Sequence, residues 1–148
     1  MIAGSSMGGL ISMYAVMKRP DVFSAAACLS THWPLKVEGL EPGAALDVWR
    51  ERLVDAWTGV IAAGLPAPGA HRIYFDRGDE TLDQFYAVFQ TQVDQTFRRR
   101  GYGPGDFRSL VFPGAQHNEA SWNQRLDVPL IDDPVKLDAL LDGWDAER

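Results

Sequence analysis

The chain has 148 residues, of which 46% are hydrophobic, and it carries a formal net charge of −6 with a sequence pI of about 4.9. That length and apolar share are enough for one soluble domain over residues 1–148 with a sizeable buried core. The negative charge disfavours nucleic-acid binding, and no apolar stretch is long enough for a membrane span, so we expect neither partner. The one basic run, Arg98–Arg100, is expected to end a helix, where cations stabilise the negative end of the helix dipole.

The first predicted element is a strand that runs through a tight turn into a helix. Met1–Ala3 is apolar, Gly4–Gly8 reads Gly-Ser-Ser-Met-Gly, and apolar residues recur at helical spacing over Leu10–Lys18. A G-x-S-x-G sequence in this context is typical of a nucleophile elbow, which holds its central serine in a strained backbone conformation with the hydroxyl exposed. The pattern predicts that Ser6 is a nucleophile and that the N–H of Met7 helps to bind an oxyanion.

Glycine is needed in such an elbow where two backbones approach closely. We expect a side chain at Gly4 or Gly8 to collide with the neighbouring strand or helix, and Gly8 and Gly9 to let the helix approach the sheet. The pentapeptide alone is a weak signal, because glycine and serine are common in ordinary loops. A phosphate-binding loop is excluded, since no Gly-Lys-Ser/Thr follows and no G-x-G-x-x-G is present.

After the elbow, predicted strands and helices alternate along the chain. The expected strands lie at 24–30, 71–76 and 107–112, and the expected helices at 46–64, 82–100, 120–126 and 132–148, with a loop at 36–43. Such alternation forms a parallel sheet with right-handed crossovers, so we expect an α/β fold, a three-layer sandwich. Cys28 lies in the apolar run of the second strand and cannot form an internal disulfide, which predicts a buried thiol and a reducing, cytoplasmic location.

Two residues after the second predicted strand are candidates for substrate contact. His32 and Trp33 follow that strand at its carboxyl end, where open α/β sheets bind ligands. The alternative is that Trp33 packs beneath the loop and that His32 is solvated. The sequence favours neither interpretation.

A histidine and a group of carboxylates follow the elbow in the order that α/β-hydrolases use. Ser6 ends the first predicted strand, an acidic loop follows the third, and His117 follows the fourth, so all three lie at one edge of the sheet. A serine hydroxyl becomes a good nucleophile only when a base takes its proton and an acid orients that base. The arrangement predicts that His117 is the base; a solvated loop histidine is the alternative.

Five blocks of the sequence together resemble one enzyme family. They are Gly4-Ser5-Ser6-Met7-Gly8-Gly9-Leu10, Pro20-Asp21-Val22-Phe23, Leu29-Ser30-Thr31-His32-Trp33, Phe75-Asp76-Arg77-Gly78 with Leu82-Asp83, and Pro113-Gly114-Ala115-Gln116-His117-Asn118-Glu119. Up to about Leu130 the chain resembles the Putative esterase family of the α/β-hydrolases, which includes esterase D-like, feruloyl and enterochelin esterases and the mycolyltransferases. The resemblance implies hydrolysis of a small-molecule carboxylic ester through an acyl-serine intermediate, with Ser6 as nucleophile and His117 as base and without metal or cofactor.

The resemblance leaves the acid of the triad open. Family members place it a few residues after the glycine that ends the third strand, which favours Asp83 and, almost equally, Glu80. Asp79 and Asp76 are weaker candidates. The competing interpretation is that Asp83 and Glu80 only stabilise the N-terminus of a helix.

The chain departs from the family pattern at its start, because five residues precede Ser6. In the family several strands, and the loop that carries the second oxyanion donor, come before the elbow. The resemblance therefore implies the C-terminal half of an α/β-hydrolase, weakly active or inactive by itself, with an exposed edge at Met1–Ala3 through which copies self-associate. An acyltransferase with the same triad and a non-catalytic remnant are the alternative functions.

Overall fold

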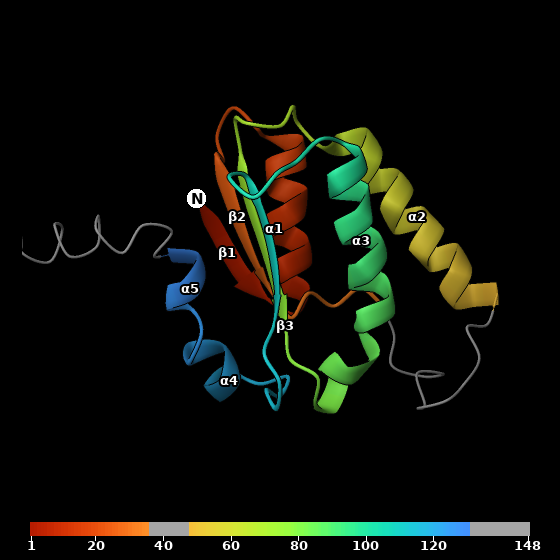
Figure 1. The fold of residues 1–148 in the computed structure, drawn as a ribbon, viewed down its shortest axis with the longest axis vertical. Coiled ribbons are helices and arrows are strands. Elements are labelled where there is room, and N and C mark those ends of the chain that lie inside the picture. The colour runs from red at the N-terminus through yellow and green to blue at the C-terminus, as the bar shows by residue number, and fades with distance from the viewer. Residues whose placement is uncertain (36–47, 131–148) are drawn as a thin grey trace, which may run out of the picture. The chain divides into compact units, whose positions relative to one another are not determined.

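A sheet of four parallel strands carries the residues of interest. In the computed structural model, which describes residues 1–35 and 48–130, the strands are β1 (Ile2–Ser5), β2 (Ala25–Leu29), β3 (Arg72–Arg77) and β4 (Phe107–Val111). They lie in the order β1-β2-β3-β4, and every neighbouring pair is parallel (Figure 1). The register pairs Ser5 with Leu29 and Leu29 with Asp76, so the carboxyl ends of these strands meet at one edge. The predicted α/β class and parallel sheet are confirmed.

Three helices cover one face of this sheet. They are α1 (Met7–Lys18), α2 (Val48–Gly64) and α3 (Ala87–Arg99) (Figure 1). Helix α1 packs against β1 and β2, and α2 lies against α3. On α3 the apolar side chains of Phe89, Val93 and Phe97 recur every four residues, and all three are buried. Arg98 and Arg99 lie in the last turn of α3, as predicted for the basic run.

Aromatic side chains fill the space between the sheet and these helices. The ring of Phe75 on β3 lies 5.6 Å from that of Trp33 and 5.6 Å from that of Phe97. Phe97 in turn stacks on Phe107 of β4 at a centroid distance of 4.5 Å. Such pairs stabilise a core beyond the area that they bury. Cys28 is fully buried beside them, which confirms its predicted place, and burial raises the pKa of its thiol.

The segment between β3 and α3 differs from the prediction. The sequence predicts one helix from residue 82, whereas the structure has a 3₁₀ helix, η1 (Thr81–Phe85), and α3 begins only at Ala87. The N–H groups of Asp83 and Tyr86 each donate to the carbonyl three residues earlier, which is the 3₁₀ pattern. The Asp83 carboxylate also accepts a hydrogen bond from the N–H of Gly78, and this contact holds the turn against the end of β3.

The chain divides into two compact units, Met1–His117 and Asn118–Arg148, and the sheet with its three helices belongs to the first. The second unit contains α4 (Glu119–Asn123) and α5 (Asp127–Leu130) in place of the single helix predicted at 120–126. Helix α4 begins after Asn118, whose side chain accepts a hydrogen bond from the N–H of Ser121 at 2.9 Å and so caps the helix.

Two predicted segments, the loop at 36–43 and the helix at 132–148, fall outside the described residues, and the helix predicted at 46–64 is described from Val48. In the described parts of the chain no helix combines the length and apolarity needed to cross a membrane.

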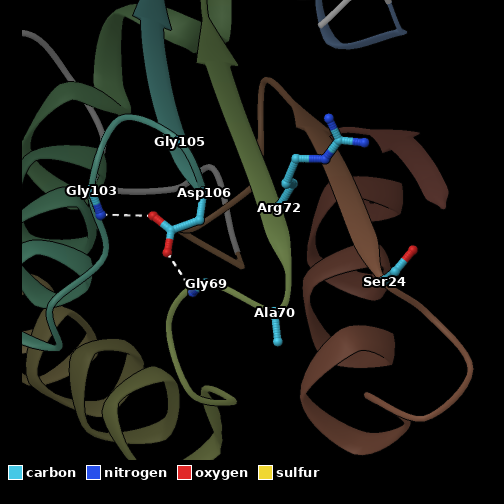
Figure 2. Close-up of a pocket in the computed structure, with 7 residues that line it drawn as sticks. All are labelled: Ser24, Gly69, Ala70, Arg72, Gly103, Gly105 and Asp106. Carbon is cyan, nitrogen blue, oxygen red and sulfur yellow. Dashed lines mark hydrogen bonds between the residues drawn. The ribbon is translucent and has the colours of Figure 1, made fainter.

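At the amino ends of β2, β3 and β4 the structure has a hollow of about 650 Å³ between loops (Figure 2). Asp106, just before β4, accepts hydrogen bonds there from the N–H groups of Gly69 and Gly103, both at 2.7 Å. One carboxylate thus ties the loop before β3 to the loop before β4. The hollow lies at the opposite end of the strands from Ser6, and these hydrogen bonds give Asp106 a structural role.

Candidate active site

Ser6 stands between β1 and α1 in a strained backbone conformation. Its φ of 56° and ψ of −121° lie outside the regions that residues with a side chain normally adopt. Hydrogen bonds from both sides hold it there. The Ser6 N–H donates to the carbonyl of Leu29 at 2.9 Å, and the Ser6 carbonyl accepts from the N–H groups of Gly9 at 3.0 Å and His32 at 3.2 Å. The strained elbow that the sequence predicts is confirmed.

The glycines of the elbow meet their neighbours at two places. A Cβ atom on Gly4 would lie 2.6 Å from the carbonyl carbon of Gly8, and one on Gly9 would lie 2.7 Å from Oγ1 of Thr31. The prediction is wrong for a side chain at Gly8, because a Cβ there would point into open space, with no heavy atom of the described residues within 4 Å. Close approach of strand, helix and sheet therefore requires glycine at positions 4 and 9.

His117 follows β4 and links two other residues of the site. Its Nε2 lies 2.9 Å from Oγ of Ser6, and its Nδ1 lies 2.6 Å from Oδ1 of Asp83. The backbone N–H of His117 donates to Oγ1 of Thr81 at 2.8 Å, which fixes the loop after β4 against η1. Side-chain exposure is 9% for His117 and 0% for Asp83. The structure thus brings Ser6, His117 and Asp83 into one chain of hydrogen bonds.

Asp83 receives hydrogen bonds on both carboxylate oxygens. Oδ2 accepts from Oγ of Ser30 at 2.5 Å and from the N–H of Gly78 at 2.6 Å, while Oδ1 faces His117. Burial by itself raises the pKa of this carboxyl group, but the hydrogen bonds from His117, Ser30 and Gly78 outweigh it and lower the pKa below its usual value. Asp83 is therefore an ionised, rigidly held acceptor beside the imidazole.

The other candidate acids lie elsewhere. Glu80 is exposed and meets the loop before His117 through its backbone, whose N–H donates to the carbonyl of Ala115 at 3.2 Å. Asp79 accepts a hydrogen bond from the N–H of Gly114 at 2.6 Å, and Asp76 is buried at the end of β3. Of the four carboxylates that the sequence offers, Asp83 is the one that the structure places on His117.

This hydrogen-bonded chain permits a defined proton transfer. When Asp83 accepts from the N–H at Nδ1 of His117, Nε2 is left as an acceptor for the hydroxyl proton of Ser6. Within the residues described, no group of three or more His, Cys, Asp or Glu side chains is arranged to hold a metal ion.

A comparison with protein families identifies the kind of protein that carries this arrangement. The model of the family described as Putative esterase matches residues 1–132, which is most of the chain. The chain belongs to the Putative esterase family. No curated protein matches it in sequence.

Solved structures similar to this Putative esterase chain share its fold. A ferulic acid esterase aligns with a TM-score of 0.54 at 18% identity, covering 84% of this chain and 46% of its own. The enterochelin esterase of Shigella flexneri aligns with a TM-score of 0.56 at 19% identity, covering 88% of this chain and 29% of its own. The enterobactin esterase of Shigella flexneri, solved in the presence of enterobactin, aligns with a TM-score of 0.54 at 21% identity and the same coverages, 88% and 29%. The chain therefore spans less than half the length of each of these three structures.

Of the two candidates for substrate contact in this Putative esterase chain, His32 lies beside the hydrogen-bonded residues. Its ring centroid is 6.4 Å from that of His117, and its Nδ1 lies 2.6 Å from the hydroxyl of Tyr86. Sequence reasoning missed Tyr86, because this residue falls in the stretch predicted to be a regular helix and off its apolar stripe. Its ring also meets that of His117 edge to face, at 5.5 Å and 90°.

Trp33 occupies a different place. It is 1% exposed, its indole N–H donates to Oε1 of Gln90 at 2.9 Å, and its ring lies 5.6 Å from that of Trp57 on α2. It also lines an apolar cavity of about 270 Å³ between α1 and α2, which reaches Met7 at the start of α1. Trp33 thus packs in the core beneath the loop, which is the alternative that the sequence allowed.

Proposed function

We propose that this chain carries the catalytic residues of a serine esterase, which hydrolyses carboxylic esters through an acyl-serine intermediate. The observation that carries the proposal is the chain of hydrogen bonds from Asp83 through His117 to Ser6, with Ser6 held at a φ of 56° in an elbow. Family membership supports the same chemistry.

In the first half of the reaction, Oγ of Ser6 attacks the ester carbonyl carbon while Nε2 of His117 takes the hydroxyl proton. The negative charge that develops on the carbonyl oxygen is stabilised by the N–H of Met7, the first residue of α1. Asp83, whose pKa is lowered, is ionised and stabilises the imidazolium. His117 then gives its proton to the oxygen of the leaving alcohol, the ester C–O bond breaks, and the acyl group remains on Ser6.

In the second half, a water molecule replaces the alcohol. Nε2 of His117 takes a proton from this water, and the resulting hydroxide attacks the acyl carbon. The C–O bond to Ser6 breaks, His117 returns the proton to Oγ, and the carboxylic acid leaves. If another alcohol took the place of water, the product would be a new ester and the enzyme an acyltransferase, so analysis of products with added alcohol separates the two.

The direct test compares two neighbouring serines. Ser6→Ala should lower kcat on a short-chain p-nitrophenyl ester by about a millionfold, because a triad without its nucleophile loses most of its rate. Ser5→Ala, one residue earlier at the end of β1, should keep the wild-type rate within a few-fold.

Even a weakly active chain allows this comparison. Loss of one oxyanion donor typically lowers kcat by about two to three orders of magnitude, far less than loss of the nucleophile, so the two serine variants can be compared even when turnover is slow. Equal rates for the wild type and Ser6→Ala, or loss of activity in Ser5→Ala alone, would contradict the proposed role of Ser6.

A further inference from the structure

Tyr86 and His32 form a hydrogen-bonded pair at the edge of the site that the mechanism above does not use. Tyr86 comes from the junction of η1 and α3, is 1% exposed, and places its hydroxyl 2.6 Å from Nδ1 of His32. His32 comes from the loop after β2 and is half-buried, and its own N–H is fixed on the carbonyl of Ser6 at 3.2 Å. Both residues are therefore held by contacts to the elbow or to the core.

The protonation states of Tyr86 and His32 decide which of them donates this hydrogen bond. Burial raises the pKa of the Tyr86 phenol, and the Asp83 carboxylate raises it further, so the hydroxyl keeps its proton. Burial lowers the pKa of His32, and the neighbouring His117 lowers it further, so the imidazole is neutral and has a single N–H.

If His32 donated from Nδ1, the phenol proton would be buried with no other acceptor among residues 1–35 and 48–130, which is costly. If Tyr86 donates instead, both partners are satisfied. The hydrogen bond is therefore O–H of Tyr86 to Nδ1 of His32, and the imidazole proton is on Nε2.

We propose that Tyr86 fixes His32 as the Nε2–H tautomer, so that His32 donates a hydrogen bond to an oxygen of the substrate close to the scissile ester. His32 is then a specificity-determining residue and Tyr86 its positioning residue. In the part of the chain that the structure describes, Nε2 of His32 has no hydrogen-bond partner, which leaves it for a ligand.

The place of His32 points to the alcohol part of the ester. Its ring lies 6.4 Å from that of His117, the residue that hands a proton to the leaving alcohol. A donor at this place suits an alcohol part that carries a further hydroxyl or ether oxygen close to the ester group, as in esters of sugars, glycerol or other polyols. This inference rests on the proposed esterase function.

The tautomer is tested first, by nitrogen chemical shifts of the His32 ring in NMR spectra, which do not depend on activity. In the wild type we expect an unprotonated, hydrogen-bonded Nδ1 and a protonated Nε2, and in Tyr86→Phe a mixture of the two tautomers. Tyr102→Phe is the matched control, because it removes a tyrosine hydroxyl that bonds to the Pro66 carbonyl at 3.0 Å instead. A proton on Nδ1 in the wild type would overturn the assignment.

The hydrogen bond to substrate is tested with esters of equal size. Butyl butanoate has no oxygen outside the ester group. 2-Methoxyethyl butanoate has an additional ether oxygen in the alcohol part, and butyl methoxyacetate has one in the acyl part. We compare kcat/KM for each in the wild type and in His32→Phe, which keeps a ring without a donor. For each enzyme we take the ratio of kcat/KM between two esters. Comparing this ratio between the wild type and the variant removes the difference in intrinsic reactivity of the substrates.

We expect the wild-type preference for 2-methoxyethyl butanoate over butyl butanoate to fall by on the order of tenfold in His32→Phe. Tyr86→Phe should lose part of it, and His32→Gln, which keeps an N–H donor, should retain part of it. A preference that depends on His32 for butyl methoxyacetate alone would place the contact in the acyl part. An unchanged ratio in an active His32→Phe enzyme would overturn the inference, whereas a wild type that neither cleaves these esters nor reacts with a fluorophosphonate would refute the esterase function itself.

Discussion

Three donors converge on the carboxylate of Asp83, and this distinguishes Asp83 from the other candidate acids. They are the imidazole of His117, the hydroxyl of Ser30 and the N–H of Gly78. Glu80 lies three residues earlier but has an extended backbone, with φ of −109° and ψ of 164°, and its side chain is exposed. The two carboxylates therefore have different surroundings despite their closeness in sequence.

Asp83→Asn should lower kcat by about four orders of magnitude, because an amide keeps the shape of the side chain but cannot stabilise an imidazolium. Glu80→Gln, the same chemical change on an exposed side chain, should leave kcat within a few-fold of the wild type. Ester hydrolysis by the two purified variants measures the difference. Equal and mild effects of the two substitutions would mean that neither carboxylate orients His117.

At the level of elements, the loops after β3 and β4 are locked together. A Cβ on Gly78 would lie 2.0 Å from the carbonyl oxygen of Ala115, two residues before His117. Backbone atoms cannot yield to such a contact without moving the loop. The position of His117 thus depends on a glycine that is distant in sequence.

Gly78→Ala should therefore displace His117 and lower kcat by on the order of a hundredfold, which is what a misplacement of about 1 Å can cost. Gly59→Ala is the matched control, since Gly59 is exposed in α2 and a Cβ there meets no heavy atom of the described residues within 4 Å. That variant should keep its activity and gain up to about 1 kcal/mol of stability. Kinetics and thermal melting of both variants provide the test, and wild-type kcat in Gly78→Ala would show that the loops are not locked.

The elements that follow a simple period could be predicted from the sequence, and those that depend on distant contacts could not. The four strands and α1 to α3 appear close to their predicted places, because apolar runs and helical spacing encode them locally. The break at η1 could not be predicted, since Thr81 adopts a φ of 50°, which a β-branched residue rarely does.

The carboxylate of Asp83 could not be distinguished from that of Glu80 for the same reason. The hydrogen bond between Tyr86 and His32 joins the junction of η1 and α3 to the loop after β2, and no sequence pattern indicates it.

For the first unit as a whole, the sheet ends at β1, which pairs with β2 alone among the described strands. Helix α1, which packs against β1 and β2, also presents exposed apolar side chains, with Met7 51%, Ile11 61% and Tyr14 55% accessible. An unpaired strand edge and an exposed apolar helix face each favour association with another chain. The net charge of −6 opposes this by repulsion between copies.

We therefore expect concentration-dependent self-association that strengthens with added salt, because salt screens the repulsion between copies. Sedimentation of the 148-residue chain at low and high ionic strength measures it. Ile11→Glu, on the exposed face of α1, should shift the equilibrium toward monomers, whereas Val22→Glu adds the same charge in the turn after α1 and should not. A chain that stays monomeric at every concentration and salt level would contradict this expectation.

The measurement that tests the central claim most directly is labelling with a fluorophosphonate, which reacts with an activated serine even where turnover is slow. Mass spectrometry of the labelled chain should find one adduct, on Ser6, and both Ser6→Ala and His117→Ala should abolish it. An adduct on another residue, or an unlabelled wild-type chain, would contradict the account of Ser6 as a nucleophile activated by His117.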